Sequence, residues 1–303
     1  MWFKNLRVYR LTEAWTLTAE ELDQALSAFC FNPCGSLDPM RYGFEPPLGR
    51  DSDLYVHSTN GNLMICTKKQ EKILPSAVIN EHIEERALAI SAAEHRQVGR
   101  KEKQSIKDEV IFSLLPKAFS RSSLNYAYIA PKENLLVVNA SSAKRAEDLL
   151  SKLREAIGSL KVIPASTKHL PTQIMTHWLT TGQLPADFEL GEECEFQAPK
   201  DGRIIRCKKQ DLTATEVLNH LNNGMYVNKL AVIWIESIQC ILDNELAIKR
   251  VKFDDVIAEK ANDRNPESKA EQFDADFAIM AGELKNFFES LFHAFGGAAD
   301  EPQ

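Results

Sequence analysis

The sequence predicts an α+β protein in which antiparallel sheets carry packed helices. Three patterns support this. The ranges 227–235, 237–242 and 247–253 alternate apolar and polar residues and are separated by short turns, as in an antiparallel meander. Apolar residues recur at helical spacing through 76–119 and again through 273–295.

The first quarter of the chain is expected to form a strand, a helix, a loop and a β-hairpin. Thr18 and Glu21 have the spacing of a capping box, which fixes the start of the helix. Four prolines and three glycines between residues 33 and 49 favour a loop there. The expected elements are the strand Trp2–Leu11, the helix Thr18–Phe29, and the strands Asp53–Ser58 and Asn62–Thr67 around the turn Asn60-Gly61.

The segment 76–121 is predicted to be a helical hairpin that protrudes from the body. One apolar stripe contains Val78, Ile83, Ala87 and Leu88, and a second runs from Ile106 to Leu115. Gly99 lies between the two stripes and is the expected turn. This hairpin is the most domain-like part of the sequence.

The remaining elements follow from caps, prolines and glycines. Thr213 and Glu216 have the spacing of a second capping box, and Gly296-Gly297 is expected to end the last helix. The segment 254–270 is polar, and no regular element is expected in it. The expected elements are the strands 126–130, 135–139 and 203–207 and the helices 142–157, 171–181, 213–222 and 273–295.

We predict three domains. Residues 1–75 and 122–165 form a central β/α domain, residues 76–121 a helical tip domain, and residues 166–303 a base α+β domain with a C-terminal helix. A chain of 303 residues is long enough for more than one core.

The charge is unevenly distributed. The net charge is -7, yet 12 acidic and 4 basic residues follow from Asp254 onward, so the rest of the chain is close to neutral. The six cysteines have neither CxxC nor zinc-ligand spacing, which suits reduced thiols in the cytoplasm. No apolar stretch is long enough for a membrane span, and the N-terminal segment does not resemble a secretory signal. We expect a cytoplasmic protein.

Two basic segments beside apolar residues indicate nucleic-acid binding. Cations of this kind bind backbone phosphates and release condensed counterions. The strand end before Thr213 and the hairpin around Phe119 are the two places where they gather. A solvated surface for the cations and core packing for Phe119 are the alternatives. The predicted DNA-binding residues are Arg96, Arg100, Lys101, Lys107, Lys117, Arg121, Lys208, Lys209 and Gln210.

Catalysis is not expected, and neither is a metal or a cofactor. The chain has no HExxH motif, no phosphate-binding GxxxxGK[ST] loop and no GxGxxG. The alternative function is a metal-dependent nuclease, for which Asp254, Asp255, Asp274 and Asp276 would supply carboxylates. A protein adaptor acting through the acidic C-terminal helix is a third possibility.

Several blocks of sequence resemble the family of the bacterial recombination-associated protein RdgC. They occur in the same order from the first residues to the last helix. The blocks are Trp2-Phe3-Lys4-Asn5-Leu6, Val8-Tyr9-Arg10-Leu11, Glu71-Lys72-Ile73-Leu74-Pro75, Lys107-Asp108-Glu109-Val110, Ser113-Leu114-Leu115-Pro116, Ala118-Phe119-Ser120-Arg121, Lys208-Lys209-Gln210-Asp211-Leu212-Thr213 and Phe273-Asp274-Ala275-Asp276-Phe277.

The resemblance implies a horseshoe-shaped subunit that forms a ring-shaped homodimer around double-stranded DNA. It implies binding without sequence preference, antagonism of the RecA recombinase, association with the nucleoid and a role in replication-fork repair. It further implies that Phe119, with Leu115, lies at the contact that closes the ring. Lys209 and Gln210 correspond to polar residues that either contact DNA or close the ring, and we place Gln210 in both sets.

Overall fold

A computed structural model describes residues 1–262 and 266–299 and shows an α+β protein. Within this part of the chain, the strands form one twelve-stranded sheet whose paired strands run antiparallel. The order is β2-β4-β5-β6-β1-β12-β11-β10-β8-β9, while β3 pairs with β4 and β7 with β1. One continuous sheet therefore replaces the several sheets expected from the sequence.

The strands are β1 (Leu6–Leu11), β2 (Met40–Phe44), β3 (Val56–Thr59), β4 (Asn62–Lys72), β5 (Ser120–Ala130), β6 (Leu135–Asn139), β7 (Val162–Pro164), β8 (Phe188–Gln197), β9 (Ile204–Lys208), β10 (Tyr226–Trp234), β11 (Ile238–Asp243) and β12 (Ile248–Phe253). The α-helices are α1 (Ala19–Ser27), α2 (Ser76–Glu94), α3 (Arg100–Leu114), α4 (Ala143–Ile157), α5 (Pro171–Thr181), α6 (Thr215–Asn222), α7 (Asp255–Asn262) and α8 (Lys269–Ala294). Short 3-10 turns occur at Gly49–Asp51 and Leu115–Lys117.

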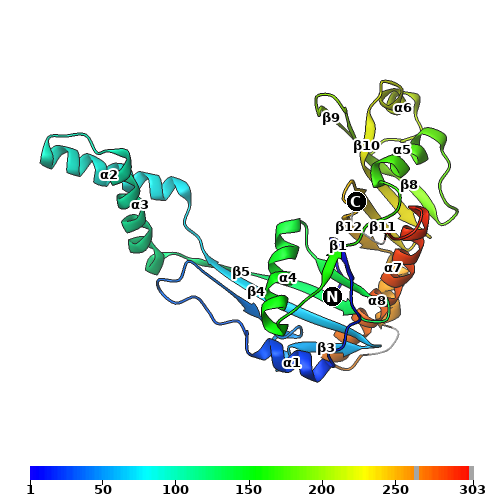
Figure 1. Cartoon of the computed structure of the whole chain (residues 1–303), viewed down its shortest axis with the longest axis horizontal. Coiled ribbons are helices and arrows are strands. Elements are labelled where there is room, and N and C mark those ends of the chain that lie inside the picture. The colour runs from blue at the N-terminus through cyan, green and yellow to red at the C-terminus, as the bar shows by residue number, and fades with distance from the viewer. Residues whose placement is uncertain (263–265, 300–303) are drawn as a thin grey trace.

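The molecule is an elongated arch (Figure 1). The long strands β4 and β5 run out from the middle to α2 and α3, which form one arm and pack against each other. The second arm carries β8, β9, α5 and α6. We call these the α2–α3 arm and the β8–β9 arm. The middle holds β1, β6 and α4, with α8 along the outside.

The central strands have an apolar core on each face, because successive side chains of a strand point to opposite sides. Ile129 and Tyr9 belong to the core beneath α1 and α4. Their strand neighbours Tyr128 and Val8 belong to the core beneath α8, which continues into the β8–β9 arm. Helix α8 contributes a row of fully buried phenylalanines to this second core, including Phe277, Phe287 and Phe288.

The α2–α3 arm is packed much more lightly than the middle. Ala87, Ile106 and Val110 are the residues of its two helices that are buried. Leu88, predicted to lie in the apolar stripe, is 71% exposed, so that prediction was wrong. A helix pair that buries so few side chains gains little stability from its own core.

The structure corrects other predictions. Strand β2 lies within the segment expected to be a loop, because pairing with β4 orders it despite its glycine. The predicted capping box at Thr213 does not form. Instead, the amide and hydroxyl of Thr213 both donate to Asp211, and α6 begins after Ala214 without a side-chain cap. The segment 254–270 contains α7, which the sequence analysis missed, and the first residues of α8, which begins at Lys269 instead of residue 273.

Candidate nucleic-acid interface

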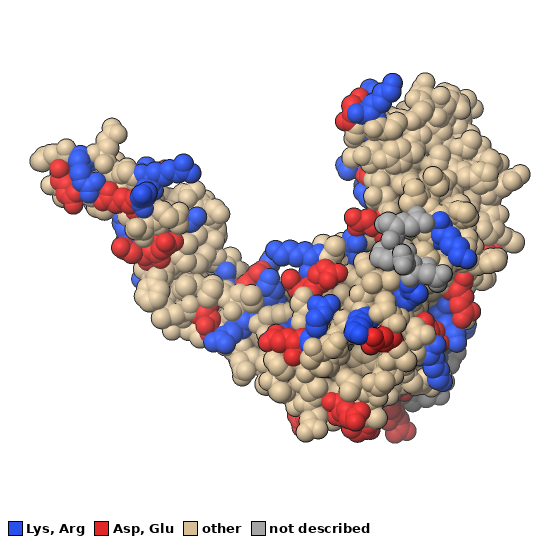
Figure 2. Space-filling view, in the orientation of Figure 1, with Lys and Arg blue, Asp and Glu red and all other residues tan. Residues whose placement is uncertain are grey.

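The space-filling surface is deeply hollowed between the two arms (Figure 2). Lys and Arg side chains lie on both arms and on the floor of this hollow, with Asp and Glu side chains between them. Cations and anions are mixed on this surface. A cation that already forms an ion pair with a carboxylate is less available to a phosphate than one that forms none.

Helix α3 carries cations that have no carboxylate partner among the described residues. Arg100, Lys103 and Lys107 have the three- and four-residue spacing that places side chains on one face of a helix. Lys101 is exposed beside them. All four cations are exposed beside the buried Ile106 and Val110, so their charged groups face water and are available to phosphates.

Three of the predicted DNA-binding residues in this region differ in their pairing. Arg96 donates to Glu94 at 2.6 Å and to both carboxylate oxygens of Glu102 at 2.7 Å. Arg121 donates to Glu71 at 2.5 Å across the β4–β5 pair. Lys117 is exposed and has no ion pair in the described part of the chain. Arg96 and Arg121 are therefore largely neutralised, unlike Lys117.

Helix α4, in the middle of the molecule between the two arms (Figure 1), carries cations that the sequence analysis missed. Lys144 and Arg145 occupy the first turn of α4, whose cap Ser142 accepts a hydrogen bond from the Arg145 amide at 3.3 Å. A cavity of about 290 Å³ beside them is also lined by Lys69 and Asn125. Cations at a helix N-terminus are electrostatically unfavourable unless an anion compensates them. That pattern, a serine cap followed by two cations, was the signal available in the sequence.

The β8–β9 arm holds its cations in an ion-pair network around one buried carboxylate. Glu195 accepts from Lys229 and Asn228 at 2.8 Å and from Arg206 at 2.6 Å. Burial raises the pKa of Glu195, but these hydrogen bonds outweigh it and lower the pKa to about 2. Glu195, Glu193 and Arg250 line one cavity on this arm, and Arg250 forms an ion pair with Glu193 there. These ion pairs therefore hold the charged side chains of the β8–β9 arm in place.

The predicted segment Lys208 to Gln210 lies at the end of this network and is exposed. Neither Lys208 nor Lys209 has a carboxylate within ion-pair distance among the described residues. Lys209 has a left-handed backbone with φ of 53°, and the Gln210 amide donates to the carbonyl of Glu192. The turn is thus held by its backbone, while its side chains are available for contact.

The two residues expected at the dimer contact differ in exposure. Phe119 is 85% exposed, whereas Leu115 is buried at 5% exposure within the subunit. Phe112, also on the α2–α3 arm, is 60% exposed. The arm therefore presents aromatic rings to solvent, whereas Leu115 is packed inside its own subunit.

The four aspartates of the nuclease alternative do not form a metal site in the described residues, where no group of three or more potential metal ligands lies together. Asp254 accepts from the Val256 amide and Asp255 lies in the first turn of α7. Asp274 contacts His57, and Asp276 pairs with the terminal amine of Met1. Asp254, Asp274 and Asp276 thus have local structural contacts.

Burial raises the pKa of several of the thiols. Cys194 and Cys207 are direct partners across β8 and β9, and burial, followed by the charge of Cys207, raises the pKa of Cys194. Burial likewise raises the pKa of Cys66 to about 12. Such groups stay protonated at neutral pH.

No helix in the described part of the chain is both long and apolar enough to cross a membrane. Fold and surface together define an arch-shaped α+β protein with a cation-bearing hollow. Residues 1–298 match the family model described as "Putative exonuclease, RdgC". The chain belongs to the RdgC family.

Several curated proteins named "Recombination-associated protein RdgC" are similar to this chain. One from Aeromonas hydrophila is 46% identical over 98% of both chains. One from Halorhodospira halophila is also 46% identical over 98% of both chains. One from Psychromonas ingrahamii is 44% identical over 98% of this chain and 99% of its own. The predicted resemblance is confirmed.

Proposed function

We propose that this protein acts in DNA recombination by binding double-stranded DNA without sequence preference, as a homodimer that encircles the duplex. Its function requires no catalysis and no cofactor. The names of its relatives support the link to recombination. Binding of this kind would place the protein at the nucleoid and at replication forks under repair.

The observation that carries the proposal is the set of unpaired cations around the hollow. Lys107 on α3 of one arm, Lys144 on α4 in the middle and Lys208 on β9 of the other arm come from distant parts of the sequence (Figure 1). None has a carboxylate within ion-pair distance among the described residues. Phosphates would compensate these charges, and this contact carries no base preference.

Dimerisation explains the exposed apolar groups of the α2–α3 arm. Phe119 and Phe112 expose large rings at an arm that has little core of its own. Contiguous exposed apolar surface marks interaction sites, and a second copy offers the same surface in a two-fold contact. A contact there and another near Gln210 on the second arm would close two arches into a ring.

A closed ring would restrain RecA by occupancy. A recombinase that assembles on DNA needs the backbone that the ring covers, so a ring that is topologically linked to DNA limits its access. This mechanism needs many weak phosphate contacts rather than a strong base contact. It therefore fits a surface on which cations and anions alternate.

The test is binding to two unrelated duplexes of equal length, together with incubation on plasmid DNA with magnesium or manganese. Equal affinities and a steep salt dependence without cleavage are expected. Strong preference for one sequence would contradict the proposal. Metal-dependent nicking would favour the nuclease alternative, which the words "Putative exonuclease" in the family description make worth testing.

A further inference from the structure

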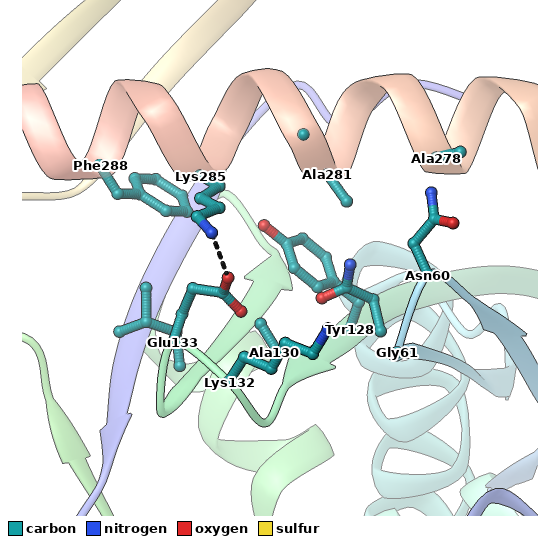
Figure 3. A pocket seen from close by; sticks show the side chains of 13 residues that line it. Asn60, Gly61, Tyr128, Ala130, Lys132, Glu133, Ala278, Ala281, Lys285 and Phe288 are labelled. Atoms are coloured by element: carbon teal, nitrogen blue, oxygen red, sulfur yellow. Dashed lines mark ion pairs between the residues drawn. The ribbon is translucent and has the colours of Figure 1, made fainter.

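A further cavity lies between α8 and two turns of the central sheet (Figure 3). Its volume is about 190 Å³. One wall is the small-residue side of α8, formed by Ala278, Ala281 and Gly282, and the other walls are the turns around Gly61 and Lys132. The cavity lies on the face of the central strands that α8 covers, whereas α4 and its cations lie on the other face.

Tyr128 provides an unpartnered polar group in this cavity. The residue is 2% exposed, and its hydroxyl has no hydrogen-bond partner among the described residues. Figure 3 shows the hydroxyl directed toward α8. Burial, followed by the charge of Glu133, raises the pKa of Tyr128, so the hydroxyl remains a donor. The hydroxyl is not among the fully buried side-chain atoms of the described residues that lack a partner, so it reaches the cavity space, where a ligand oxygen can replace water as its acceptor.

Gly282 is a second feature that the fold alone does not require. It lies inside the 26-residue helix α8, where glycine is the least favourable residue after proline. A Cβ atom added at Gly282 would meet nothing within 4 Å, so no close backbone approach demands glycine. Gly282 is exposed and lines the cavity, so the absence of a side chain there leaves the approach to the cavity unobstructed.

The charges around the cavity favour an anion. Glu133 is paired with Lys285 at 3.0 Å, and this ion pair forms one edge of the cavity. Lys132 has no carboxylate partner in the described part of the chain. Asn60 and Asn62 add amide groups to the lining. The Tyr128 hydroxyl and the Lys132 ammonium can both donate to an anion, and each amide can donate through its nitrogen.

We propose that this cavity binds a small ligand through a carboxylate or phosphate group, with Tyr128 and Lys132 as donors and Gly282 providing the space. The volume corresponds to roughly six water molecules at about 30 Å³ each. It is smaller than sites for drug-sized molecules, so the ligand has the size of a small metabolite. This site is additional to the DNA-binding function and does not depend on it.

Calorimetric titration of the full chain at constant ionic strength tests the proposal, with inorganic phosphate and acetate as separate probes. The variants are Tyr128→Phe and Gly282→Leu, which remove the donor and fill the space. Lys161→Ala is the control, because Lys161 is an exposed lysine paired with Glu13 away from the cavity. Saturable binding of at least one probe is expected in the wild type and the control.

Each of the two cavity variants should weaken that binding at least ten-fold, while its thermal midpoint without probe stays at or above that of the wild type. Binding of phosphate alone identifies a phosphoryl ligand, and binding of acetate alone a carboxylate. Absence of binding for both probes, or equal binding in both cavity variants and the wild type, would overturn the proposal. A lower midpoint in both variants would equally overturn it, because the hydroxyl and the glycine would then serve the fold.

Discussion

The carbonyl of Phe119 accepts a hydrogen bond of 2.7 Å from the amide of Ile73, while the Phe119 ring is 85% exposed. The backbone is therefore held at the point where the chain leaves the α2–α3 arm and enters β5. Only the side chain extends into solvent. A ring presented from a fixed backbone loses little conformational entropy when it is buried against a partner.

Phe119→Ser should shift the protein from dimer to monomer at micromolar concentration. The ring contributes apolar area to the contact, and its loss should weaken dimerisation by about 2 kcal/mol or more. Sedimentation equilibrium measures the effect. The thermal midpoint should change little, because the ring packs against little of its own subunit.

Leu88→Ser is the matched control for this prediction. Leu88 is 71% exposed on the same arm, outside the predicted contact. It should leave the dimer intact. Equal dimerisation of Phe119→Ser and the wild type would exclude Phe119 from the interface.

Replacing Lys208 and Lys209 together by Ala should weaken binding equally on unrelated duplexes. Two lost phosphate contacts should reduce the slope of log affinity against log salt by about 2. Anisotropy titrations at several salt concentrations provide the slope. Arg203→Ala is the control, because Arg203 is exposed near the same strand but paired with Asp201 at 2.6 Å. An effect limited to one sequence would argue against phosphate binding.

Arg96→Ala should reduce DNA affinity less than Lys107→Ala. Glu94 and Glu102 already compensate Arg96, whereas Lys107 has no such partner among the described residues. Each free cation should change affinity several-fold at low salt, and Arg96 by less than two-fold. The DNA affinities of the two variants and the wild type, measured at one salt concentration, test this order of effects. A larger loss for Arg96→Ala would show that its ion pairs break on binding.

Glu195 should make stability depend on pH in the acid range. Its folded-state pKa of about 2 lies below the ordinary value of 4.5, so the contribution is complete above pH 4.5 and disappears as pH falls toward 2. The shift corresponds to roughly 3 kcal/mol. Urea unfolding between pH 5 and pH 2.5 should show most of this loss in the wild type and not in Glu195→Gln. Parallel curves for the two proteins would contradict the assignment.

The sequence predicted those helices and strands whose start or periodicity is encoded in neighbouring residues. The capping box of α1 is confirmed by reciprocal hydrogen bonds between Thr18 and Glu21. The helix over 142–157 and the meander over 227–253 are also confirmed. Strand β8 was missed because its middle is rich in glutamate, and only the partners of Glu195 show why a carboxylate is tolerated there.

The candidate site was less predictable, because charge pairing depends on the folded chain. The sequence shows that Arg121 is basic, but not that Glu71 faces it across two strands fifty residues apart. It also gave no reason to connect Lys144 with Lys208, because only the fold shows that α4 lies in the middle of the arch and β9 on one of its arms. The cavity at Tyr128 likewise needs α8, whose residues are more than 140 positions away.

The central claim is that the protein encircles DNA, and retention on closed circular duplex tests it most directly. Protein loaded at low salt on a closed circle and on the same DNA linearised is challenged with high salt and competitor. We predict that the closed circle retains protein much longer, and that cutting it with a restriction enzyme releases the protein. Equal dissociation from circular and linear DNA would contradict encirclement.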